Sequence, residues 1–260
     1  MSLSTFKRYE MKFLLNNEQF EALTPKLLDY MEPDKYCQNG TDYTIYNIYY
    51  DTQDNHLIRT SLSKPYYKEK LRLRSYTSQT SVNSKVFLEL KRKTGGIVHK
   101  RRAAMTLQEA YDFLESGKRP ITTRYIDEQV INEIIYFLSH NKVNPATYIS
   151  YSRIAFYGKM DKSFRITFDN NIITRRNDLN LEAGSFGNQL LGNGQFIMEI
   201  KISNSVPVWL AEILSELNIY KTNFSKYGVE YKKYCLNKEP YESSSYASNI
   251  VHSPHLCVNY

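Results

Sequence analysis

Arg, Lys and Glu recur at every second position in six strand-like segments of this chain. These segments are Arg8-Glu10-Lys12, Lys70-Arg72-Arg74, Glu89-Lys91-Lys93, Val98-Lys100-Arg102, Arg165-Thr167-Asp169 and Glu199-Lys201. Side chains two residues apart in a strand point to the same face, so each set projects from one side of a sheet. Guanidinium and ammonium groups bind phosphate, and carboxylates bind divalent metal ions. Such strands closed into a barrel would therefore line it for a polyanion and a metal.

A charged sheet face is most simply a solvated face opposite the core. A solvated face mixes Ser, Thr, Gln, Asn and Lys, whereas these faces concentrate Arg and Lys with a few Glu. Taken alone, Arg8-Glu10-Lys12 is better explained as an exposed ladder of ion pairs, which contributes little stability. Its recurrence in six segments favours a phosphate contact at Lys12 with Glu10 as a metal ligand.

Other basic residues extend this pattern. Arg72 and Arg74 can each grip a phosphate through a planar fork, with Lys91 and Lys100 on neighbouring strands. Cations facing each other across strands repel unless an anion lies between them, which argues for a ligand. We expect Arg153 and Arg165 to be cross-strand partners lining the same space.

The metal ligand is expected at Glu199, because its neighbours Met198 and Ile200 face the apolar layer and Glu199 faces away. Lys226 follows a helix as a lone lysine and shows no pattern of its own.

The elements that position these residues are mostly strands. Alternating apolar and polar residues predict eight strands, at residues 6–15, 41–50, 68–76, 86–93, 97–104, 146–157, 163–169 and 195–202. Gly95-Gly96 predicts a hairpin turn. Helical spacing predicts an outer set of helices near residues 17–28, 55–61, 107–117, 124–138 and 208–217, the third opened by a Thr106–Glu109 capping box. This mixture predicts an α+β fold, with one domain over residues 1–236 and a polar tail over 237–260.

Composition narrows the classes of function. The chain has 260 residues, 34 Lys+Arg against 27 Asp+Glu and a net charge of +7, which favours an anionic partner. The three cysteines and five histidines lack metal-ligand spacing, and no GxSxG, GxGxxG or P-loop pattern occurs. We expect no nucleic-acid partner, because the aromatic residues alternate with the charges and are predicted to be core. With no run of 18 apolar residues and no leader, we expect a cytoplasmic protein without a membrane segment.

Several motifs resemble a known family when taken in order. Arg8-Tyr9-Glu10-Met11-Lys12, Ile48-Tyr49-Tyr50-Asp51-Thr52, Leu71-Arg72-Leu73-Arg74 and Glu89-Leu90-Lys91 resemble the CYTH-like triphosphate tunnel metalloenzyme superfamily. Within it, the chain resembles the vacuolar transporter chaperone (VTC) polyphosphate polymerase domain through Ser152-Arg153-Ile154-Ala155-Phe156, Arg165-Ile166-Thr167-Phe168-Asp169, Met198-Glu199-Ile200-Lys201 and Phe224-Ser225-Lys226-Tyr227.

The resemblance implies an antiparallel eight-stranded β-barrel, or tunnel, with helices packed outside. It implies a transferase that uses ATP and manganese or magnesium to extend inorganic polyphosphate. By the same resemblance, phosphates would be held by Lys12, Arg72, Arg74, Lys91, Lys100, Arg153, Arg165 and Lys226, and the metal by Glu199 with Glu10 as a weaker ligand.

One departure bears on the reaction. The superfamily's opening ExExK pattern is here Arg8-x-Glu10-x-Lys12, so one carboxylate is missing and two-metal hydrolysis is less favoured. Two alternatives stay open: a triphosphatase acting on triphosphate or nucleoside triphosphates, and a module that only binds polyphosphate or another polyanion. The primer, the oligomeric state and recruitment by a membrane partner are not indicated by the sequence.

Overall fold

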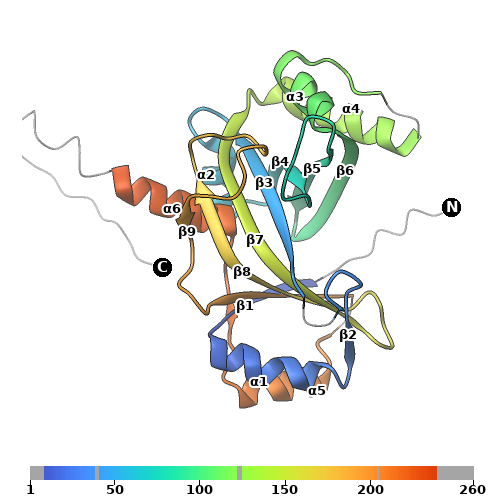
Figure 1. The fold of residues 1–260 in the computed structure, drawn as a ribbon, viewed down its shortest axis with the longest axis vertical. Helices are drawn as coiled ribbons and strands as arrows, with labels where there is room; N and C mark the ends of the chain where they lie inside the picture. Colours follow the sequence, from blue (N-terminus) through green and yellow to red (C-terminus); the bar gives the residue numbers. More distant parts are fainter. Residues whose placement is uncertain (1–8, 39–40, 122–124, 204, 239–260) are drawn as a thin grey trace, which may run out of the picture.

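The computed structural model describes residues 9–38, 41–121, 125–203 and 205–238, and its strands form one antiparallel sheet (Figure 1). Eight long strands correspond to the eight predicted ones: β1 (Tyr9–Leu15), β3 (Tyr43–Asp51), β4 (Tyr67–Ser75), β5 (Lys85–Thr94), β6 (Ile97–Thr106), β7 (Asn144–Gly158), β8 (Arg165–Arg175) and β10 (Phe196–Ile202). The short strands β2 (Met31–Pro33), β9 (Asn188–Gln189) and β11 (Lys221–Thr222) were not predicted, because two or three residues show no alternation.

The sheet is curled but not closed. Its hydrogen-bonded order is β11-β1-β10-β8-β7-β3-β4-β5-β6, and within the described residues the end strands β6 and β11 do not pair. The closed eight-stranded barrel is therefore not confirmed. The curl is nevertheless strong, because Glu10 on β1 lies 3.6 Å from Lys91 on β5 although β10, β8, β7, β3 and β4 stand between these strands in the order.

Six helices accompany the sheet in the described ranges: α1 (Asn17–Leu27), α2 (His56–Leu62), α3 (Leu107–Ser116), α4 (Tyr125–His140), α5 (Val208–Glu216) and α6 (Lys226–Lys238). The Thr106–Glu109 capping box is confirmed at the start of α3, and Gly117 ends that helix with φ 75°. Gly95 and Gly96, with φ 54° and 88°, form the predicted turn between β5 and β6.

Two apolar layers cover the convex face of the sheet. The first joins Leu71, Leu73 and Leu88 to α3 and α4, and the second joins Ile166, Met198 and Ile200 to α1 and α5. Figure 1 shows these two helix pairs at opposite ends of the molecule. The prediction that helices pack outside the sheet is confirmed for these four, and the charged residues that alternate with the core are left on the concave face.

Helix α6 was not predicted and packs differently. Tyr227 of α6 is buried in a third cluster with Ile45, Tyr49 and Ile149, which lie on the concave face. No secondary structure was predicted from sequence for residues 226–238. Helix α6 extends to Lys238, and residues 239–260 lie outside the described part, so the division at residue 236 stays a prediction. No helix in the described ranges is long and apolar enough to cross a membrane.

Candidate functional site

The predicted site residues gather on the concave face. They come from seven strands and the first residue of α6, and they are Glu10, Lys12, Arg72, Arg74, Lys91, Lys100, Arg153, Arg165, Glu199 and Lys226. The pairing of β4, β5 and β6 arranges part of this face in rows. One row holds Arg72, Glu89 and Arg102, and the next holds Lys70, Lys91 and Lys100. The strand register therefore creates the basic surface that alternation alone predicted.

Glu89 is the centre of the first charged cluster. Its side chain is 1% exposed, and its oxygens lie 2.8 Å from Arg72 Nε, 2.7 Å from Lys100 Nζ and 2.9 Å from Arg102 Nε. Arg74 Nε lies at 3.7 Å. Burial raises the pKa of Glu89, but these cations together hold it well below its ordinary value. The expectation that facing cations need an external anion is wrong for this row, because Glu89 is that anion.

Phenols complete the surroundings of the two arginines. Arg72 Nη1 donates to Tyr49 Oη at 3.0 Å, and Arg74 Nη2 donates to Tyr151 Oη at 3.4 Å. Burial raises the pKa of Tyr49, but Arg72, Lys70 and Arg74 outweigh it and lower that pKa to about 8. Sequence reasoning did not propose either tyrosine as a site residue. Tyr49 on β3 and Tyr151 on β7 lie at the alternating positions that share a face with the charged residues, and this alternation could have identified them.

Asp169 is the centre of the second cluster. It is fully buried, and its carboxylate receives Arg153 Nε at 2.6 Å, Arg153 Nη2 at 2.7 Å and the Lys226 ammonium. Lys226 Nζ also lies 4.3 Å from the centroid of the Tyr151 ring. Burial raises the pKa of Asp169, but Arg153 and Lys226 lower it to about 2. Asp169 was not proposed as a site residue, although it shares the alternation of Arg165.

Arg153 and Arg165 are not cross-strand partners. The Gly158 N–H donates to Phe164 O, and this turn sets the register so that Tyr157 faces Arg165 and Asp169 faces Arg153. Arg165 Nη2 lies 3.3 Å from Asp34 Oδ2. Its buried Nε has no hydrogen-bond partner within the described part of the chain. Arg165 Nε is therefore a buried donor that the described residues leave unsatisfied.

Helix α6 is docked by two further contacts, which explain how Lys226 reaches the concave face. Tyr227 Oη donates to Asp51 Oδ2 at 2.8 Å, and Arg176 binds both carboxylate oxygens of Glu230 at 2.7 and 2.8 Å. Asp51 also accepts the Leu57 and Ile58 backbone N–H groups at the start of α2. The first turn of α6 is thus fixed against β3, β8 and α2, and it places Lys226 beside Asp169.

The two predicted metal ligands are neighbours on adjacent strands. Lys12 of β1 pairs in register with Glu199 of β10, and Glu10 pairs with Lys201. Glu199 contacts Lys201 at 2.7 Å, and Glu10 lies 3.5 Å from Lys12. Burial raises the pKa of Glu199, but Lys201, Lys12 and Arg153 hold it far below its ordinary value, so the side chain is ionised.

These carboxylates are too few for a cage made of protein alone. Among the residues that the structure describes, no group of three or more His, Cys, Asp or Glu is arranged to hold a metal. Mg²⁺ and similar ions are commonly bound by one or two carboxylates together with substrate phosphates and water. Glu199 and Glu10 fit that second arrangement, in which phosphate supplies most of the oxygen ligands.

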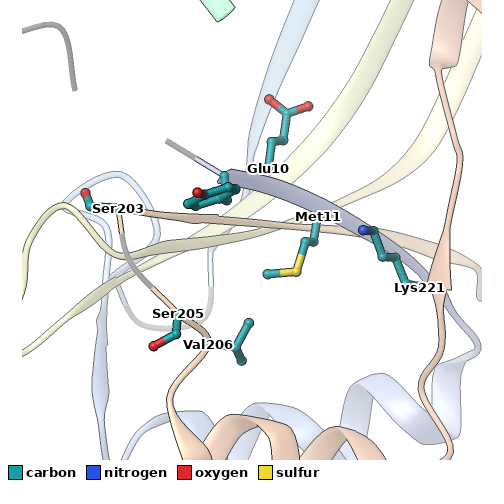
Figure 2. Close-up of a pocket in the computed structure, with 7 residues that line it drawn as sticks. Glu10, Met11, Ser203, Ser205, Val206 and Lys221 are labelled. Carbon is teal, nitrogen blue, oxygen red and sulfur yellow. The ribbon is translucent and has the colours of Figure 1, made fainter. Parts of the chain in front are cut away.

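A hollow beside β1 touches this charged face only at Glu10. It has a volume of about 620 Å³ and is lined by residues that include Met11, Val206 and Lys221. Figure 2 shows Met11 pointing towards Val206, while Glu10 points to the other side of β1. The hollow therefore adds no predicted phosphate ligand to the site.

Comparison with known proteins agrees with this arrangement. The VTC domain model matches residues 7–235. A Bacillus halodurans protein described as a "putative adenylate cyclase" has a similar structure, with a TM-score of 0.51, 18% identity, and coverage of 84% of this chain and 95% of that one. That likeness shows the fold alone.

Two other solved structures are less similar. A Vibrio parahaemolyticus protein, also described as a "putative adenylate cyclase", has a TM-score of 0.44 at 12% identity, covering 86% of this chain and 97% of that one. A Pyrococcus horikoshii protein has a TM-score of 0.42 at 16% identity, and the match covers 87% of this chain and 99% of that one. Among curated proteins, no sequence matches the chain.

Proposed function

The chain belongs to the VTC domain family, and from that premise we propose that it is a metal-dependent polyphosphate polymerase. It would transfer the γ-phosphoryl group of ATP to the end of an inorganic polyphosphate chain and release ADP. The observation that carries the proposal is the concave face, where cations from β1, β4, β5, β6, β7, β8 and α6 gather with only a few carboxylates. Phosphoryl transfer depends mainly on positioning and charge neutralisation, which such a face supplies.

The reaction requires little covalent chemistry from the protein. A terminal oxygen of the acceptor chain bonds to the γ-phosphorus while the bond to the β–γ bridging oxygen breaks, and that electron pair leaves with ADP. The acceptor phosphate is already anionic, so no general base is needed. Arg72, Arg74 and Lys100 would neutralise and orient the transferring phosphates, and Arg165 would hold the chain further along.

The carboxylates Glu199 and Glu10 would hold a manganese or magnesium ion together with phosphate oxygens. When bound, such an ion supplies charge neutralisation at the transferring phosphoryl group. The buried Glu199 is ionised and lies beside Lys12, so the protein keeps a negative group next to its phosphate-binding lysine. Arg8 replaces the first carboxylate of the superfamily's pattern, which supports transfer to a phosphate over two-metal hydrolysis.

The test is to identify the products from ATP. The purified protein is incubated with ATP and Mn²⁺, with parallel samples containing EDTA, and products are separated by gel electrophoresis. Glu199→Gln removes one proposed metal ligand without changing side-chain size, and Glu216→Gln, on an exposed helix end, is the matched control. We expect a ladder of phosphate chains with ADP from the wild type and the control, and none from Glu199→Gln or with EDTA.

Two other results would contradict the proposal. Free phosphate without a ladder would identify a triphosphatase. Binding of polyphosphate with no turnover of ATP under any metal condition would identify a binding module.

A further inference from the structure

One end of the basic surface is unbalanced in charge. Lys68 on β4 faces Lys93 on β5 in register, and in the next row Lys70 faces Lys91. These lysines share the concave face with Arg72 and Arg74, because they lie at even steps along the same strands. Like charges directly opposite each other destabilise an antiparallel pair. Glu10, 3.6 Å from Lys91, partly offsets the second row, whereas the described residues place no carboxylate beside the Lys68–Lys93 row.

The lysines of these rows differ from the arginines in what they contact. Within the residues that the structure describes, no carboxylate lies at ion-pair distance from Lys68, Lys70 or Lys93. Lys68 Nζ donates to the Ser61 carbonyl at 3.0 Å, and Lys70 Nζ lies 3.4 Å from Ser225 Oγ.

Besides burial, repulsion among neighbouring lysines lowers the pKa of Lys68. Burial lowers the pKa of Lys68, and Lys93, Lys91 and Lys64 lower it further. By contrast, the row of Arg72 is neutralised by Glu89. Unlike the row of Arg72, the Lys68–Lys93 row therefore has no carboxylate among the described residues to neutralise it.

We propose that Lys68 and Lys93 form a separate subsite for the polyphosphate chain, beyond the site that holds the transferring phosphates. The proposal rests on the proposed function, since it assigns a second position to the same polyanion. From Arg74 to Lys68 the strand spans six residues, or about 20 Å. A three-phosphate unit does not cover that length, whereas a longer chain does. The subsite therefore selects long chains over tripolyphosphate and nucleotides.

The test compares binding of two probes in the absence of ATP and metal. Sodium tripolyphosphate and a polyphosphate of about fifteen units are titrated into the full chain at several salt concentrations. The variant is Lys68→Gln/Lys93→Gln, which removes two facing cations and should fold at least as well as wild type. The control is Lys26→Gln/Lys162→Gln, which removes the same charge from exposed ion pairs elsewhere. Thermal unfolding of both variants checks the fold.

We expect the subsite variant to bind the long chain about tenfold more weakly than the control variant and to bind tripolyphosphate within twofold of it. The slope of log affinity against log salt for the long chain should fall by about 1.4, as for two lost phosphate contacts on a flexible strand. Equal losses for both probes, or no loss beyond that of the control, would overturn the subsite. Because no ATP is present, either result is independent of whether the protein makes polyphosphate.

Discussion

Replacement of Asp169 by Asn should destabilise the protein and make its stability depend on a bound anion. The substitution keeps the shape of the side chain but removes the charge that Arg153 and Lys226 share. The lowering of the Asp169 pKa from 3.8 to about 2 corresponds to about 2 kcal/mol at neutral pH. Two cations would then remain buried without their partner, which raises the expected loss to about 3–5 kcal/mol.

Denaturant unfolding at pH 7, with and without tripolyphosphate, measures this effect. The control is Asp29→Asn, because Asp29 is exposed at the end of α1 and should change the free energy of unfolding by less than about 0.5 kcal/mol. An anion that binds beside Arg153 and Lys226 replaces the missing charge, so tripolyphosphate should stabilise Asp169→Asn more than it stabilises the wild type.

The pH dependence gives an independent check. Because the pKa of Asp169 is lowered by folding, its stabilising contribution is complete above about pH 4 and is lost as pH falls towards about 2. The difference between wild type and Asp169→Asn should therefore narrow over that range. Equal stability of Asp169→Asn and Asp29→Asn at pH 7 would refute the reasoning that Asp169 holds these two cations.

Two further predictions concern protonation and the docking of α6. Burial lowers the pKa of Lys70 to about 8 despite the opposing effect of Tyr49, whose own pKa is also about 8, so tripolyphosphate affinity measured by calorimetry should fall as pH rises from 7 to 9. The decline should be smaller in Lys70→Arg and smallest in Lys70→Arg/Tyr49→Phe, and an unchanged slope would contradict the assignment. Tyr227→Phe removes a donor from the buried Asp51 carboxylate and should cost about 1.5–3 kcal/mol, with faster hydrogen exchange in α6. The exposed Tyr220→Phe is its control, and matching exchange rates in the two variants would show that this bond does not dock the helix.

The sequence predicts the strands of this fold well, because most of the long strands alternate apolar residues on one face with polar or charged residues on the other. Phe164, Ile166 and Phe168 mark β8 in this way, and the Thr106–Glu109 capping box marks the start of α3. These signals are local, and the forces behind them act within a few residues. They can therefore be recognised without knowledge of the rest of the chain.

The charge pairing within the site could not be predicted in the same way. Glu89 contacts cations of β4 and β6, and these contacts depend on the register of both strand pairs. The register of β7 and β8, set by the hairpin before Arg165, places Asp169 and not Arg165 opposite Arg153. The position of Lys226 depends on α6, which docks through contacts made far along the chain. Only the family resemblance indicated that lysine, since no local pattern distinguishes it.

Lysine labelling tests whether the concave face holds a phosphate chain. The protein is treated with acetic anhydride with and without tripolyphosphate, and the modified lysines are quantified by mass spectrometry. Lys100 and Lys26 have equally exposed side chains, at 39%, but only Lys100 lies on the concave face. We predict that tripolyphosphate protects Lys100 and Lys91 and leaves Lys26 unchanged. Equal protection of Lys26 and Lys100, or protection of neither, would contradict phosphate binding at the concave face.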